Sequence, residues 1–127
     1  MVDLATFTGA CAVALGSASG IMANDAGIRE ALHEASDAVG ELAWPLPLFE
    51  DFKGQIKSDF ADIKNLGDRF GGALTAGLFL EAFVDESIPW AHMDIAGSAW
   101  GGKDSGYLPK GGTGIAVRTL CHWLRTM

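Results

Sequence analysis

His92 and Asp94 are the side chains whose types and spacing most suggest chemistry. They stand two residues apart in Trp90–Gly97, which is predicted to begin as a strand and run into a glycine turn. Alternate strand residues project from one face, so Trp90, His92 and Asp94 are expected on the same side. Such a pair can transfer protons or bind a metal ion. We favour a hydrogen-bonded His92–Asp94 pair that anchors the strand, because buried polar groups normally find such partners.

A second segment, Thr6–Gly9, follows another predicted strand, Val2–Phe7. Backbone groups at a strand end can pair with an extended peptide, and glycine at position 9 would let the peptide backbone approach closely. The alternative, given equal weight, is a tight turn that requires a small residue. The two segments are expected to form two walls of one pocket. Neither has a nearby cluster of Lys, Asp and Glu that could hold metal ions or activate a water.

Other functional classes find little support. The chain contains no Gly-x-Ser-x-Gly, His-Glu-x-x-His or Gly-x-x-x-x-Gly-Lys-Ser/Thr motif, so a serine hydrolase, a zinc helix and a phosphate-binding loop are disfavoured. A net charge of -7 with scattered basic residues disfavours nucleic acid. Cys11 and Cys121 form no Cys-x-x-Cys pair and suit a reducing cytoplasm. Gly72–Val84 is too short to span a bilayer, so no membrane partner is expected.

These residues must be positioned by strands and helices that alternate along 127 residues, enough for one domain. The pattern predicts an α/β layered sheet. The expected strands are Val2–Phe7, Ile21–Ala23 and Trp90–Ala96, with an extended connector over Trp44–Leu48 and extended chain over Asp59–Ile63. The expected helices are Ala10–Leu15, a helix from Asn24 or Asp25 to Gly40, Asp51–Ile56, a buried Gly72–Val84, and a last helix after a long Gly101–Gly114 loop, with Ile115, Leu120, Trp123 and Leu124 inward.

Several motifs occur together in one order. They are Ala5-Thr6-Phe7-Thr8-Gly9-Ala10-Cys11, Trp44-x-Leu46-Pro47-Leu48, Lys57-Ser58-Asp59-Phe60-Ala61-Asp62, Asn65-Leu66-Gly67 and Trp90-Ala91-His92-Met93-Asp94-Ile95-Ala96-Gly97. In these motifs the chain closely resembles the catalytic domain of leucyl (cytosol) aminopeptidases. The resemblance implies the three-layer α/β/α sheet of that domain, incomplete in this chain. It makes residues 1–127 the C-terminal portion of a metallo-aminopeptidase catalytic domain.

The resemblance also implies an activity. Such enzymes release N-terminal amino acids such as leucine from peptides, use two divalent metal ions, zinc or manganese, and form a cytoplasmic hexamer. The family's ligands end in an Asn-Thr-Asp-Ala-Glu-Gly-Arg motif ahead of the segment corresponding to Val2, and this motif is missing here. We therefore expect no catalytic residue and no metal ion in this chain, and no activity from the chain alone.

By similarity, the chain keeps part of the substrate pocket. Thr6, Gly9, Ala96 and Ala99 would line the space for the first side chain of the peptide, and Leu66 would contact the second. In the Phe7–Thr8–Gly9 segment, the Phe7 carbonyl and Gly9 amide would pair with the peptide backbone. Many relatives have Met where Ala99 stands, so the side-chain preference is expected to differ.

One alternative is a non-catalytic α/β module for assembly or peptide binding. An in-frame Asn-Thr-Asp-Ala-Glu-Gly-Arg motif upstream of Met1 would favour the enzyme, and a stop codon would favour the module. In either case, open sheet edges and apolar faces predict a homo-oligomer.

Overall fold

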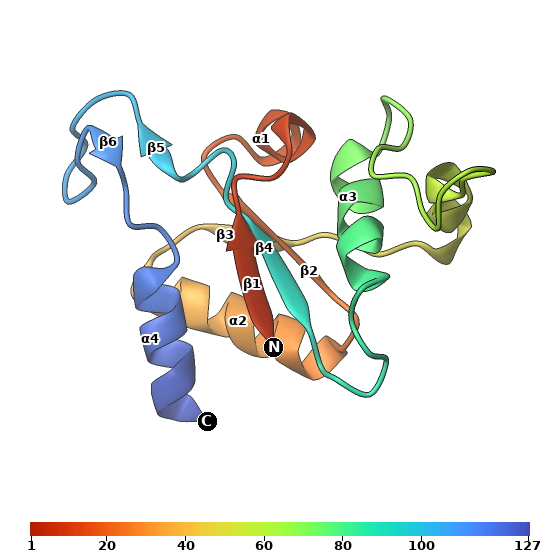
Figure 1. The fold of residues 1–127 in the computed structure, drawn as a ribbon. Coiled ribbons are helices and arrows are strands. Elements are labelled where there is room, and N and C mark those ends of the chain that lie inside the picture. Colours follow the sequence, from red (N-terminus) through yellow and green to blue (C-terminus); the bar gives the residue numbers. More distant parts are fainter.

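A computed structural model describes all residues 1–127. The chain folds around a four-stranded sheet with the strand order β1–β4–β2–β3 (Figure 1). The strands are β1 (Val2–Ala5), β2 (Ser19–Ala23), β3 (Ala43–Pro45) and β4 (Ala91–Asp94). Strand β4 runs parallel to β1 and antiparallel to β2, and β3 runs parallel to β2. The mixed sheet confirms the predicted α/β class. Because β1 and β4 are neighbours, the two segments with candidate chemistry lie side by side.

Helices cover both faces of this sheet and produce three layers (Figure 1). The helices are α1 (Gly9–Leu15), α2 (Ala26–Val39), the 3₁₀ helix η1 (Glu50–Ile56), α3 (Gly72–Glu81) and α4 (Val117–Thr126). Helices α2 and α4 pack on one face, and α1 and α3 on the other. A small hairpin, β5 (Trp100–Gly101) and β6 (Gly111–Gly112), lies within the segment expected to be a loop. No helix has both the length and the apolar character that a membrane span requires.

The hydrophobic core lies between the sheet and the α2–α4 layer. Its buried members are Ile21, Leu32, Ala43, Ala91, Met93 and Ala116. Leu120 and Trp123 of α4 pack against this cluster, as predicted. Leu124 was expected to face inward, and this is wrong, since it is 63% exposed. One residue beyond Trp123, it is turned about 100° around the helix, off the contact stripe.

Helix α3 packs on the opposite face of the sheet. At Gly77 an added Cβ would lie 2.6 Å from Met22 Sδ, so the glycine allows close approach of helix and strand. The helix ends at Glu81, earlier than the predicted Val84, and none of its residues is exposed. Its buried residues are Ala73, Thr75, Gly77 and Leu78, whereas Phe83, just beyond it, is 70% exposed.

Interactions between residues close in sequence determine where several helices and turns begin and end. The Asp25 carboxylate accepts a hydrogen bond from Ile28 N (2.9 Å) at the start of α2, and Gly40 ends the helix with a positive φ of 69°, as predicted. Pro45 lies in the edge strand β3, where its missing N–H is tolerated. Residues 59–63 were expected to be extended, but residues 59–62 form bends. The Ser58 hydroxyl there accepts hydrogen bonds from two following amides, which folds the chain back.

Candidate functional site

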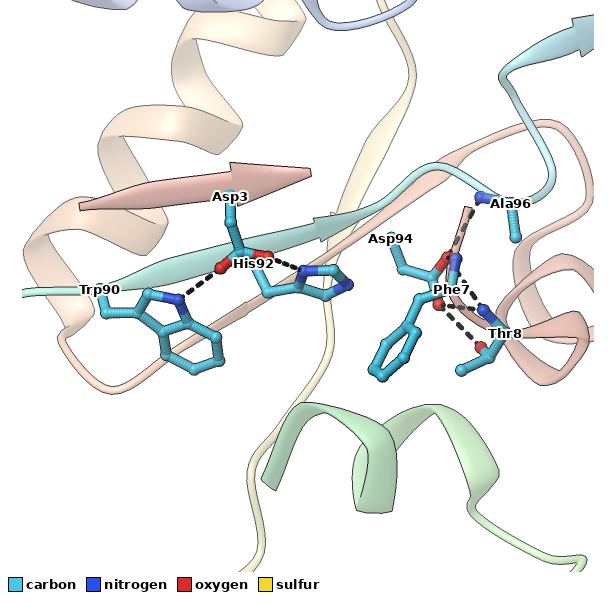
Figure 2. A network of polar contacts seen from close by, with 7 residues as sticks. All are labelled: Asp3, Phe7, Thr8, Trp90, His92, Asp94 and Ala96. Atoms are coloured by element: carbon cyan, nitrogen blue, oxygen red, sulfur yellow. Dashed lines mark hydrogen bonds and ion pairs between the residues drawn. The ribbon is translucent and has the colours of Figure 1, made fainter. Parts of the chain in front are cut away.

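Asp94 lies at the end of β4 and is completely buried. Its Oδ1 accepts hydrogen bonds from the amides of Phe7 (3.1 Å) and Ala96 (3.1 Å). Its Oδ2 accepts from the Thr8 amide (3.1 Å) and the Thr8 hydroxyl (2.7 Å) (Figure 2). These donors satisfy a buried carboxylate without any cationic side chain among them. The carboxylate therefore ties the end of β4 to the loop that leaves β1.

Thr8 connects this loop to α1. It is the N-cap residue, with φ -130° and ψ 136°, and its hydroxyl accepts a hydrogen bond from Cys11 N at 3.0 Å. The same hydroxyl donates to Asp94, so the side chain is held from two sides. Gly9 follows as the first helical residue. An added Cβ there would meet no atom within 4 Å, so the turn itself does not require glycine at this position.

A cleft of about 540 Å³ opens beside this loop and is called the β1–α1 cleft below. It is lined by Phe7, Thr8, Gly9, Ala10, Asn65, Leu66, Gly67, Asp68, Arg69, Gly72, Thr75 and Ala76. Four residues of the predicted site, Phe7, Thr8, Gly9 and Leu66, therefore border one space. Leu66 reaches it from the segment before α3 and is 78% exposed.

The other three predicted residues, Thr6, Ala96 and Ala99, are not part of the cleft lining. Thr6 is exposed and directly precedes Phe7. Ala96 belongs to the turn after β4 and donates its amide to Asp94, which places it at the same end of the two strands as Phe7 (Figure 2). The Ala99 carbonyl accepts a hydrogen bond from Thr113 N (3.0 Å).

The predicted His92–Asp94 hydrogen bond is wrong, although both residues lie on the expected face. His92 Nδ1 instead contacts Asp3 Oδ1 at 2.5 Å, and Trp90 Nε1 donates to Asp3 Oδ2 at 2.5 Å (Figure 2). Asp3 is the direct partner of His92 in the parallel ladder. Adjacent strands are about 4.8 Å apart, whereas residues two apart in one strand are separated by about 6.6 Å. The partner across the sheet is therefore nearer.

Asp3 is thus a residue that the sequence interpretation missed, although it stands in the strand already predicted. His92 is fully buried, and its Nε2 has no hydrogen-bond partner. The imidazole packs edge-on against the Phe7 ring, with centroids 5.5 Å apart. Phe7 thus contacts His92 and also lines the β1–α1 cleft, whereas His92 is not part of the lining.

A second hollow, of about 560 Å³, lies between η1 and the C-terminal part of α3. Lys53 Nζ contacts Glu50 at 2.8 Å and Glu81 at 3.4 Å. The hydrogen bond to Glu50 is the main cause that raises the pKa of Lys53 above its usual value. The three-residue spacing of Glu50 and Lys53 in the sequence was an available signal for this pair.

The side chains of this chain do not fit a site for two metal ions. No three His, Cys, Asp or Glu side chains are grouped to hold one. The Asp94 carboxylate already accepts hydrogen bonds from the Phe7, Thr8 and Ala96 amides and from the Thr8 hydroxyl. Asp3 is engaged by two aromatic side chains. Burial, followed by the charge of Asp94, raises the pKa of the Cys11 thiol to about 11, so Cys11 stays protonated near neutral pH.

Comparison with known protein sequences shows the family to which the chain is similar. The family described as "Cytosol aminopeptidase family, catalytic domain" matches residues 1–121. The chain is 57% identical over 122 residues to a probable cytosol aminopeptidase of Streptomyces coelicolor, covering 94% of this chain and 24% of the relative. For its counterpart in Nitratidesulfovibrio vulgaris the identity is 51% over 121 residues, with the same coverage of 94% and 24%.

Solved structures also resemble the chain in fold. A mutant of tomato leucine aminopeptidase matches with a TM-score of 0.92 and 39% identity, covering 99% of this chain and 24% of that one. The bottromycin maturation enzyme BotP in complex with Mn matches with a TM-score of 0.93 and 38% identity, covering 98% of this chain and 28% of that one. The chain spans about a quarter of the length of these relatives. With its sequence and its fold both matched, the chain belongs to the cytosol aminopeptidase family and corresponds to part of the catalytic domain.

Proposed function

We propose that this chain provides part of the peptide-binding surface of an aminopeptidase that releases N-terminal residues such as leucine from peptides. The observation that carries the proposal is the β1–α1 cleft, bordered by Phe7, Thr8, Gly9 and Leu66, within a chain matched to the cytosol aminopeptidase family over residues 1–121.

Two backbone groups at this cleft suit an extended peptide. The Phe7 carbonyl and the Gly9 amide take part in no hydrogen bond within the chain. One accepts and the other donates, as an added strand requires. The open space beside Gly9 leaves room for a side chain of the peptide. Thr6, Ala96 and Ala99 complete the proposed pocket for the first side chain, and Leu66 contacts the next residue.

The metal ions of the proposed reaction belong to polypeptide outside this chain, because the residues present here do not fit them. The proposed pair is zinc or manganese, and one solved relative is described as a complex with Mn. Divalent ions activate water as a nucleophile. The residues of this chain bind and orient the peptide.

The proposed setting is a cytoplasmic homo-oligomer, a hexamer in the full-length enzyme, with peptides as substrates and no nucleic-acid or membrane partner. Relatives named as cytosol aminopeptidases support the location. The net charge of -7 disfavours polyanionic partners.

Two measurements on the chain test the proposal. Titration of ¹⁵N-labelled protein with the tripeptide Leu-Gly-Gly is expected to shift the amide signals of Phe7–Gly9 and Leu66. Assay with leucine p-nitroanilide and added manganese is expected to give no turnover. Robust turnover would contradict the assignment of metal binding to other polypeptide. Peptide-induced shifts located only elsewhere would contradict the proposed site.

A further inference from the structure

We infer that Asp94 is a positioning residue for peptide binding, a role that rests on the function proposed above. Its carboxylate orients the backbone of Phe7–Gly9 so that the Phe7 carbonyl and the Gly9 amide are available to a peptide in the β1–α1 cleft.

The first part of the argument is the geometry of the peptide group between Phe7 and Thr8. This group is planar and trans, since the chain has no cis peptide bond, and its C=O and N–H point in opposite directions. The Thr8 N–H points to Asp94, with its nitrogen 3.1 Å from Oδ2. The Phe7 carbonyl must therefore point away from Asp94, and it is left without a partner in the chain.

The second part concerns the next peptide group, between Thr8 and Gly9. The Thr8 hydroxyl donates to Asp94 at 2.7 Å and accepts from Cys11 N at 3.0 Å. These two contacts hold Thr8 as the N-cap, with extended φ and ψ before α1. The Gly9 N–H is consequently one of the unpaired donors at the start of the helix. One carboxylate thus controls both groups that the peptide would use.

The carboxylate is also specific for this task. Replacing it with the nearly isosteric carboxamide of Asn puts an NH₂ group in place of one oxygen. With the Phe7 and Ala96 amides both 3.1 Å from Oδ1, the carboxamide oxygen is expected at that position. The NH₂ group would then face the Thr8 amide, which is itself a donor. Asp94→Asn should therefore release the Phe7–Thr8 peptide group while preserving the volume of the side chain.

The test compares three forms of the ¹⁵N-labelled chain: unsubstituted, Asp94→Asn and Ile21→Val. Ile21 belongs to the core on the opposite face of the sheet and controls for a general loss of stability, which thermal unfolding measures. Asp94→Asn is expected to weaken binding of Leu-Gly-Gly at least about tenfold, as for one lost hydrogen bond. Amide exchange at Phe7 and Thr8 should accelerate in the same variant. Ile21→Val should weaken neither peptide binding nor the protection of the Phe7 and Thr8 amides in particular.

The outcomes separate the two proposals. Equal affinity of Asp94→Asn and the unsubstituted chain, with Phe7 and Thr8 amides still protected, would overturn the role of Asp94 alone. A lack of peptide-induced shifts in the unsubstituted chain would overturn the proposed function, and the positioning role with it. If Asp94→Asn does not fold, Thr8→Val removes one donor to the same carboxylate. It should weaken peptide binding and accelerate exchange at Thr8, and no change in either would refute the inference.

Discussion

Replacing Gly9 with alanine should leave the fold stable and weaken peptide binding. An added Cβ at Gly9 meets no atom within 4 Å, and its φ is not in the positive range that favours glycine. Gly54 in η1 shares both properties but is not part of the β1–α1 cleft. Gly54→Ala is therefore a matched control.

The size of each effect follows from these surroundings. Alanine at a compatible glycine position restricts the unfolded chain and raises the free energy of unfolding by about 0.5 kcal/mol. Both variants should therefore melt at or slightly above the temperature of the unsubstituted chain. At Gly9 the methyl group would also occupy space proposed for the peptide. Inserting a methyl into a filled site costs about 2 kcal/mol, which corresponds to a roughly thirtyfold higher Kd.

The assay combines thermal unfolding by circular dichroism with the Leu-Gly-Gly titration for both variants. Equal peptide affinity of Gly9→Ala and Gly54→Ala would refute the placement of the peptide beside Gly9. A loss of more than about 1 kcal/mol in the stability of Gly9→Ala alone would instead show that the turn requires glycine.

Three further predictions concern the scaffold. In Gly97→Ala the new Cβ would clash with the Gly16 carbonyl oxygen, a backbone atom that cannot move aside locally. We expect the free energy of unfolding in urea to fall by about 3 kcal/mol, and an unchanged unfolding midpoint would contradict the geometry. Glu41→Leu removes the buried acceptor of the Thr119 amide and hydroxyl and should cost about 1–3 kcal/mol in urea unfolding. No loss would contradict these contacts. The pKa of Cys11 is raised from 9.0 to about 11 in the folded chain, so its contribution to stability is present below pH 9 and is lost as the pH rises toward 11. This loss of stability between pH 9 and 11 should disappear in Cys11→Ala, and its persistence would exclude Cys11 as the source.

Features determined by neighbouring residues were predictable from the sequence. The Asp25 cap and the Gly40 terminus of α2 depend on contacts within a few residues, and both were predicted. The strand character of Trp90–Ala96 and the common face of His92 and Asp94 follow from alternation alone, and both are present, although the strand is shorter, Ala91–Asp94.

Features set by register between distant strands were not predictable in this way. Periodicity places His92 on a face, but it contains no information on which residue of β1 stands opposite, so the Asp3 partner was missed. Similarly, an apolar sequence predicts that α3 has neighbours, but does not show that the helix ends at Glu81 rather than at Val84. In the candidate site, the grouping of Phe7 with Leu66 came from family resemblance, because no local pattern connects segments that distant in sequence.

The position of β4 between β1 and β2 also constrains the order in which the sheet can form during synthesis. Strand β1 pairs only with β4, through contacts from Val2–Ala91 to Ala5–Asp94. Until the ribosome has passed Asp94, β1 and β2 lack the strand that lies between them in this sheet. Closing such a long loop is entropically costly and slow. The Asp94 contacts that hold the Phe7–Gly9 loop are therefore expected to form late, only after β4 has been synthesised and has paired with β1.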